Sequence, residues 1–272
     1  MILPRLLIAD IDGTLVEANE DFPDYTRKVL KKLHDAGVLF GIASGRPCFQ
    51  IKHVVQKWDL GFDVDLLIGL NGVELYDCTD NNTYLSNLLK KEIIKKAYDM
   101  VGPDALNSFI YRDEVELAII CDEKMKGHIE KGLITVKLCK SPEELWEVDN
   151  AKIMFRFKTP EELEKVRSRI SDTDEYKCFK TQTTLLEFAD PHVDKAVSLQ
   201  KYCELHDIDL KEVVACGDNS NDNGMLKAAG TGICLKDGAD DTKECSDEIT
   251  DLSCKEEGLA HYLVKKYNLS VD

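Results

Sequence analysis

Short apolar runs alternate along the chain with segments whose apolar residues recur at helical spacing. Residues 6–9 are continuously apolar and end in a turn signal, which favours a strand covered on both faces. Residues 25–36 have a helical period and precede Gly37, a residue suited to the positive φ of a helix end. Further apolar runs follow at 38–43 and 65–69. This alternation predicts a parallel sheet with helices on both faces.

The pattern changes between residues 83 and 187. Within residues 151–158, apolar side chains alternate with polar ones that include Lys152 and Arg156, as expected for a half-buried strand. The other elements predicted here are a helix over 87–101, two strands around a turn within 106–121, a helix over 159–170 and a hairpin over 177–188. We therefore expect an α+β module whose sheet is antiparallel and has one open face.

The first pattern resumes after this block, with a helix over 193–205 and an apolar strand at 213–217. One domain is thus predicted to be interrupted by another. The expected fold is a doubly wound α/β core with a parallel sheet, formed by residues 1–82 and 188–272, and an inserted α+β cap domain, formed by residues 83–187.

The chain carries 35 Lys and Arg residues against 51 Asp and Glu residues, a net charge of −16. This balance argues against binding to nucleic acid or to anionic membranes, and any anionic substrate must meet a local positive centre. The ten cysteines contain no CxxC pair, and the apolar N-terminal stretch is too short for a signal peptide. We expect a reduced, cytoplasmic protein, a monomer or weak homodimer, whose partner is a small molecule.

Polar side chains follow three of the predicted strands. Asp10 ends the first, Ser44 follows the second, and Asp218 follows the strand at 213–217. Because ligands bind beyond the carboxyl ends of parallel strands, these residues are predicted to meet at one edge of the sheet.

Asp10 and Asp12 would repel each other unless a cation lies between them or one of them holds a proton. Together with Asp218 and Asp222 they would offer the hard oxygen ligands that Mg²⁺ prefers. Backbone N–H groups near Gly13 and Thr14 could face an anion, as turns of this kind allow.

Each of these motifs has a plainer interpretation when taken alone. Asp-x-Asp-Gly is most often a turn, the sequence SGRP at 44–47 is common where a strand meets a helix, and residues 217–222 could form a polar loop. Lys195 alone would be an exposed helical lysine. The occurrence of all four in this order, each against a predicted strand or helix start, favours a functional site.

The chain resembles the haloacid dehalogenase superfamily, specifically its Cof-type sugar-phosphatase branch, which has a haloacid dehalogenase-like core and a large α/β cap. The sequences that carry this resemblance are DIDGT at 10–14, SGR at 44–46, Lys195 in HVDKAVSL, GDNSNDNGML at 217–226 and, more weakly, NGVEL at 71–75.

The resemblance implies that Asp10 is the nucleophile and that Asp12 is the general acid and base. It implies that Mg²⁺ is bound by Asp10, the Asp12 carbonyl and Asp218, with Asp222 orienting the metal shell. The residues that it places at the phosphate or substrate are Gly13, Thr14, Ser44, Gly45, Arg46, Asn71, Lys195 and Asn221. Asp194, beside the lysine, departs from the usual pattern of the family.

In the cap, Glu187 resembles a residue that contacts substrate hydroxyls, and the alternative is a strand-end charge in water. Arg112, Lys152 and Arg156 are the cap charges of interest, and Arg156 could either face substrate or lie solvated on the sheet.

The leading functional hypothesis is a Mg²⁺-dependent phosphatase that hydrolyses small phosphorylated metabolites, sugar phosphates first, through an aspartyl phosphate. A phosphomutase of the phosphomannomutase type is the nearest alternative, but it would need a second phosphate site built from several cap arginines. A non-catalytic metabolite sensor on the same fold is a further alternative, which the presence of both Asp10 and Asp12 disfavours.

Overall fold

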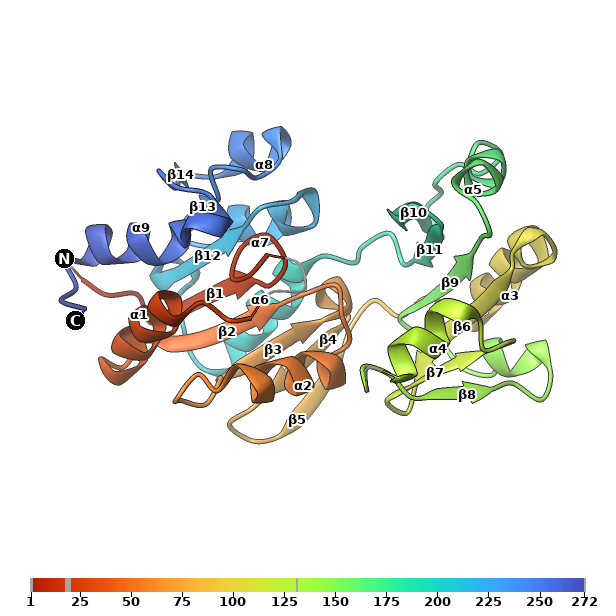
Figure 1. Cartoon of the computed structure of the whole chain (residues 1–272), viewed down its shortest axis with the longest axis horizontal. Helices are drawn as coiled ribbons and strands as arrows, with labels where there is room; N and C mark the ends of the chain where they lie inside the picture. Colours follow the sequence, from red (N-terminus) through yellow and green to blue (C-terminus); the bar gives the residue numbers. More distant parts are fainter. Residues whose placement is uncertain (1, 18–20, 131, 272) are drawn as a thin grey trace. The chain divides into compact units, whose positions relative to one another are not determined.

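The computed structural model describes all residues except 1, 18–20, 131 and 272, and it contains two compact units (Figure 1). The core unit comprises Met1–Ser86 and Asp194–Asp272, and the cap unit comprises Asn87–Val193. The boundaries between the core unit and the cap unit lie a few residues beyond those expected after residues 82 and 187. The reason is that strand β5 (Asn82–Leu85) still pairs in the core sheet and β11 (Leu185–Ala189) completes the cap sheet.

Within the described residues, eight strands form the core sheet in the order β14-β13-β12-β1-β2-β3-β4-β5. The pairs from β14 to β3 are parallel, whereas β4 and β5 add an antiparallel hairpin at one edge. The strands are β1 (Leu6–Asp10), β2 (Leu39–Ala43), β3 (Leu66–Gly69), β4 (Glu74–Asp77), β12 (Val213–Gly217), β13 (Thr231–Cys234) and β14 (Glu248–Ile249). The predicted parallel α/β core is confirmed, and the hairpin of β4 and β5 is a feature that the sequence did not predict.

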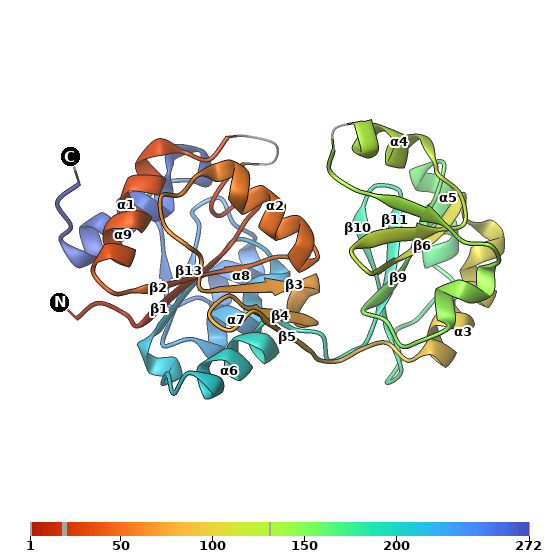
Figure 2. The ribbon, with the colours of Figure 1, turned by 90° about the horizontal axis from the view of Figure 1, so that it is seen from below.

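Helices cover both faces of this sheet, as Figure 2 shows for α1 and α2 on one side and α6 on the other. Leu7 and Ala9 of β1 pack with α1 (Asp24–Asp35), α2 (Cys48–Trp58) and α9 (Gly258–Tyr267). Leu6 and Ile8 pack on the opposite face with α6 (Lys195–Leu205) and α7 (Asn223–Ala228). Helix α8 (Asp240–Cys245) lies beside α7. Burial on both faces explains why β1 is apolar at every position before Asp10.

The cap unit contains a sheet of six strands among the described residues, in the order β10-β11-β9-β6-β7-β8. All of its pairs are antiparallel except β7 with β8. Its remaining strands are β6 (Asn107–Arg112), β7 (Val115–Ala118), β8 (Val136–Leu138), β9 (Lys152–Arg156) and β10 (Lys177–Gln182). Its helices are α3 (Lys91–Val101), α4 (Glu123–Glu130) and α5 (Pro160–Arg167).

The expectation of one open sheet face is wrong for β9, because all five of its residues are buried. Lys152 is 7% exposed and Arg156 is 6% exposed. Met125 of α4 packs on this face with Phe109 and Met154. Each basic side chain also has a carboxylate partner, which makes burial of its charge tolerable.

All ten cysteines lie within the described residues and are free thiols. In the part of the chain that the structure describes, no helix has the length and apolar character needed to cross a membrane.

Candidate active site

Asp10, Ser44 and Asp218 lie at the same edge of the core sheet, as predicted. Asp10 is the last residue of β1, Ser44 directly follows β2, and Asp218 directly follows β12. These three strands are parallel neighbours, so their carboxyl ends meet at that edge. Asp10 is 7% exposed and Ser44 is 3% exposed, so the polar groups here are largely removed from water.

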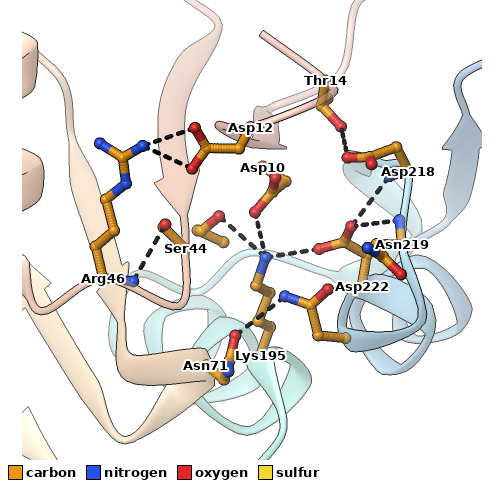
Figure 3. Close-up of polar contacts among 12 residues, drawn as sticks. Asp10, Asp12, Thr14, Ser44, Arg46, Asn71, Lys195, Asp218, Asn219 and Asp222 are labelled. Carbon is orange, nitrogen blue, oxygen red and sulfur yellow. Dashed lines mark hydrogen bonds and ion pairs between the residues drawn. The ribbon is translucent and has the colours of Figure 1, made fainter. Parts of the chain in front are cut away.

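Lys195 is the positive centre of this edge (Figure 3). It begins α6 and is fully buried. Its Nζ atom donates to Oδ1 of Asp10 at 2.5 Å, to Oδ1 of Asp222 at 2.6 Å and to the Ala43 carbonyl at 3.1 Å. Burial lowers the pKa of Lys195, but the two carboxylates outweigh it and raise this pKa above its ordinary value. The lysine therefore remains charged, and it is not the exposed helical residue that its sequence position alone suggests.

Asp218 is held by the loop that follows β1. Its Oδ1 atom accepts a hydrogen bond of 2.8 Å from the Thr14 hydroxyl. Gly13 has φ of 94° and lies against the same carboxylate, since a Cβ atom there would be 2.4 Å from Oδ2 of Asp218. Burial raises the pKa of Asp218 to about 6, although the Thr14 hydrogen bond lowers it. Glycine is thus required at position 13 for both backbone conformation and space.

The Gly13 and Thr14 N–H groups, which the sequence suggested as donors to an anion, donate to carbonyl groups of their own turn in this structure. The Gly13 N–H donates to the Val16 carbonyl at 2.8 Å, and the Thr14 N–H donates to the Ile11 carbonyl at 3.4 Å. These bonds close the turn on itself. Turn formation therefore uses the donors that the sequence pattern had suggested for a ligand.

Asp222 stabilises the loop that carries Asp218. It is fully buried, and its Oδ2 atom accepts hydrogen bonds from the backbone N–H groups of Asp218 and Asn219 at 3.0 and 3.1 Å. Its Oδ1 atom accepts from Lys195. Both oxygens are therefore engaged with protein groups, and the side chain fixes the loop against α6.

Asp10, Asp218 and Asp222 form an acidic cluster in which one oxygen of each lies within 4.8 Å of the others. Burial raises the pKa of Asp10 to about 7, and the nearby carboxylates also raise it. Lys195 lowers this pKa, but its effect is smaller than these two together. One lysine faces three carboxyl groups. In both Asp10 and Asp218, Oδ1 accepts a hydrogen bond, whereas Oδ2 has no hydrogen-bond partner among the described residues. This donor set suits a hard divalent cation.

The Asp12 side chain lies outside this cluster. Both of its carboxylate oxygens contact Nη2 of Arg46, at 2.6 and 2.8 Å, and the two side chains are 40% and 36% exposed (Figure 3). The sequence had suggested Arg46 as a ligand of phosphate or substrate, and in this structure its partner is the neighbouring acid.

Asn71 and Asn221 also lie at this edge of the core sheet. The Asn221 side-chain amide donates to Oδ1 of Asn71 at 3.1 Å, and the Ser44 hydroxyl accepts from the Arg46 N–H at 3.3 Å. A Cβ atom on Gly45 would lie 3.3 Å from Oδ1 of Asn71. The structure thus brings together all predicted site residues of the core unit.

A model of the haloacid dehalogenase-like hydrolases matches residues 7–263. The chain belongs to this family. A protein from Haemophilus influenzae that carries a phosphatase name is 30% identical and matches over 99% of both chains. The 5-amino-6-(5-phospho-D-ribitylamino)uracil phosphatase YcsE of Bacillus subtilis is 25% identical over 94% of this chain and 93% of its own. The family resemblance seen in the sequence is confirmed.

A solved structure of a haloacid dehalogenase-like hydrolase from Bacteroides thetaiotaomicron has the same fold, with a TM-score of 0.84. It is 22% identical and matches over 97% of this chain and 99% of that chain. Both the split core and the inserted cap therefore recur along the whole length of a fold neighbour.

In this haloacid dehalogenase-like hydrolase, Glu187 lies within the cap unit. It is 4% exposed, and its carboxylate accepts hydrogen bonds from Lys152 and from the Thr181 hydroxyl, both at 2.9 Å. The alternative of a strand-end charge in water is wrong, because β10 and β9 flank Glu187 on both sides.

Asp122 and Asn107 of the hydrolase make polar contacts in the cap unit that the sequence patterns did not predict. Oδ2 of Asp122 accepts from Nε of Arg156 at 3.0 Å and from the Asn107 amide at 2.8 Å. The solvated position considered for Arg156 is therefore wrong. Asp122 also accepts from the Met125 N–H at the start of α4, so a helix-capping pattern was the available signal.

Proposed function

We propose that this hydrolase is a Mg²⁺-dependent phosphatase that acts on small phosphorylated metabolites, with sugar phosphates as the first class to test. The observation that carries the proposal is the buried Asp10 carboxylate, which contacts the Lys195 ammonium and lies in an acidic cluster with Asp218 and Asp222. The cap unit, Asn87–Val193, would select the substrate, and the free thiols fit a reducing, cytoplasmic location.

Asp10 would act as the nucleophile. Its Oδ1 atom contacts Lys195, and its Oδ2 atom is the oxygen available to attack phosphorus. Attack forms an O–P bond to Asp10 and breaks the bond between phosphorus and the leaving alcohol. The Lys195 ammonium and the Ser44 hydroxyl would hold the other phosphoryl oxygens, because a phosphoryl transition state needs fixed donors and positive charge.

Asp12 would supply the proton to the leaving oxygen and then remove one from the water that hydrolyses the aspartyl phosphate. Its side chain is half-exposed and faces Arg46, so it can turn toward substrate without the cost of leaving a buried position. Arg46 would then be free to bind an anionic group of the substrate, and Asn71 and Asn221 would lie beside it.

Mg²⁺ would be held by Asp10, the Asp12 carbonyl and Asp218. When bound, the ion neutralises negative charge on the transferring phosphoryl group and on the cluster. Asp222 would orient this shell, since both of its oxygens already fix Lys195 and the loop of Asp218.

The charge of the chain and the names of its relatives support a small phosphorylated metabolite as substrate. The net charge of −16 disfavours nucleic acid, and YcsE is named for a phosphorylated metabolite. Glu187 would bind a substrate hydroxyl, which could replace the Thr181 hydroxyl as a donor to Oε1. The mutase alternative would need a second phosphate site built from several cap arginines. Arg112 and Arg156 each contact one carboxylate, in Glu147 and Asp122, so their charges are partly neutralised, although Nη2 of Arg112 and Nη1 of Arg156 have no hydrogen-bond partner among the described residues.

The test is an incubation of the full chain and Mg²⁺ with a panel of phosphorylated metabolites, followed by measurement of inorganic phosphate. Glucose 1-phosphate with a bisphosphate activator is the discriminating substrate. We expect free sugar and phosphate. Formation of glucose 6-phosphate would favour the mutase, and absence of turnover across the panel and with p-nitrophenyl phosphate would overturn the proposal.

A further inference from the structure

The turn between β3 and β4 has an unusual backbone. Its three consecutive residues, Leu70, Asn71 and Gly72, have φ values of 51°, 58° and 100°. Leucine rarely adopts this left-handed region, and Leu70 is also buried, at 4% exposed. Such a conformation persists where surrounding contacts hold it, so the contacts of the turn are informative.

One side of the turn is fixed to two loops of the active site. The Asn71 N–H donates to the Ser44 carbonyl at 3.0 Å, and the Leu70 N–H donates to the Arg46 carbonyl at 2.9 Å. The Asn71 side chain accepts from Asn221 at 3.1 Å. The loops that follow β2 and β12 are thus both attached to this turn.

The other side of the turn contacts the start of α6. The Ser198 hydroxyl donates to the Gly72 carbonyl at 2.8 Å, and both groups are buried. A Cβ atom on Gly72 would lie 2.0 Å from the Asp194 carbonyl oxygen and 2.9 Å from the Lys195 nitrogen. Because these neighbours are backbone atoms, α6 can approach this closely only when residue 72 is glycine.

Asp194 is enclosed from a second direction. Its carboxylate accepts from the Ala196 N–H at 2.8 Å and so caps α6. A Cβ atom on Gly224 of α7 would lie 2.0 Å from Oδ2 of this carboxylate. The helix start is therefore held between Gly72 and Gly224, and the acid beside Lys195 serves as the helix cap.

We propose that Gly72 is a positioning residue for Lys195. The turn is anchored to the Ser44 and Asn221 loops, and Gly72 sets the distance from these loops to the first residue of α6. It thereby fixes where the Lys195 ammonium meets the phosphoryl group. This inference rests on the proposed function of Lys195, and it assigns a role to the segment 70–72 that lies outside the acid and lysine motifs.

The experiment compares Gly72→Ala with Gly37→Ala. Both glycines have positive φ, of 100° and 91°, but a Cβ atom on Gly37 finds no atom within 4 Å. The control therefore carries the backbone cost without the clash. We expect Gly72→Ala to lower kcat for p-nitrophenyl phosphate roughly 10- to 100-fold, the effect of a small misplacement of a reacting group. Gly37→Ala should retain the wild-type kcat.

Binding of inorganic phosphate, followed by calorimetry, is measured in parallel. We expect Gly72→Ala to weaken it and Gly37→Ala to leave it unchanged, because only the former moves Lys195. Equal kcat and equal phosphate affinity in the two variants would overturn the inference. Absence of turnover in the wild type would overturn the proposed function instead, and the phosphate affinities would still decide the role of Gly72.

Ser198→Ala provides a second variant if Gly72→Ala does not fold, as judged by circular dichroism. It removes only the hydroxyl that binds the Gly72 carbonyl. Its matched control is Ser168→Ala, whose hydroxyl donates to the Lys165 carbonyl in the cap unit. A lower kcat and weaker phosphate binding in Ser198→Ala alone would support the inference, and identical values in the two variants would overturn it.

Discussion

The Nζ atom of Lys195 lies 2.5 Å from Oδ1 of Asp10, and both side chains are buried where β1 ends. The same ammonium contacts Asp222, and Asp218 lies within the same acidic cluster. One positive charge thus faces three carboxyl groups. Proximity of like charges in a buried site must be balanced by a proton or a cation. Activity and stability are therefore expected to depend on Mg²⁺ and on pH.

Asp10→Asn should abolish the release of phosphate from p-nitrophenyl phosphate. The amide has nearly the same shape but is a poor nucleophile, so the Lys195 contact can persist while the covalent step cannot occur. Steady-state kinetics measure this change. Asp35→Asn, at an exposed carboxylate that pairs with Lys31, is the matched control and should leave kcat unaltered. Near-normal turnover by Asp10→Asn would remove the nucleophile assignment.

Lys195→Met should both inactivate and destabilise the protein. It leaves Asp10 and Asp222 buried without their counter-charge, which costs about 3 kcal/mol or more in comparable buried pairs. The loss should be largest at pH 8 in the presence of a chelator, because burial raises the pKa of Asp10 to about 7 and its carboxyl group can take up a proton at lower pH. Urea denaturation measures it. Lys201→Met, at an exposed position of α6, is the control, and equal stability of the two variants would contradict the buried ion pairs.

Removal of divalent cations should abolish the activity of the enzyme. Without an added positive charge, the acidic cluster repels an incoming phosphate. We expect a chelator to abolish turnover and Mg²⁺ to restore it.

Thermal unfolding gives an independent measurement, since Mg²⁺ should raise the Tm of the wild type by binding to the folded state. The matched variant is Asp218→Asn, in which this increase should be smaller. Full activity in excess chelator, or an equal increase in Tm for both proteins, would argue against the metal site.

Glu116 should make the stability of the cap unit fall as pH rises. Its side chain is 5% exposed, and burial raises its pKa from 4.5 to about 7. The neutral form is favoured in the folded state, so its contribution to stability is fully present below pH 4.5 and is lost as pH rises through 7. Each unit of pKa difference corresponds to about 1.4 kcal/mol, so the loss is on the order of 3 kcal/mol.

Glu116→Gln should remove this pH dependence, because glutamine stays neutral. Urea denaturation of the wild type and the variant at pH 5 and pH 8 measures the difference. The variant should match the wild type at pH 5 and exceed its stability at pH 8. Glu147→Gln, at a carboxylate that is 61% exposed, is the control. Parallel stability curves for Glu116→Gln and the wild type would show that Glu116 ionises freely.

The sequence by itself determined the alternation of strands and helices in the core and the residues at the strand ends. The apolar runs of β1, β2 and β12 are long enough to indicate burial on both faces, and a parallel sheet brings their carboxyl ends to one edge. Asp10, Ser44 and Asp218 follow those runs directly, so their proximity required no knowledge of side-chain contacts.

Tertiary structure decided which charges are paired and which donors remain available. Arg156 meets Asp122 and Lys152 meets Glu187 across 34 and 35 residues, and neither spacing leaves a periodic signal. For the same reason, alternation along β9 predicted an open face where partners from other elements bury it. Local pattern reports on hydrophobicity and turn formation, whereas the pairing of buried charges depends on the three-dimensional approach of distant segments.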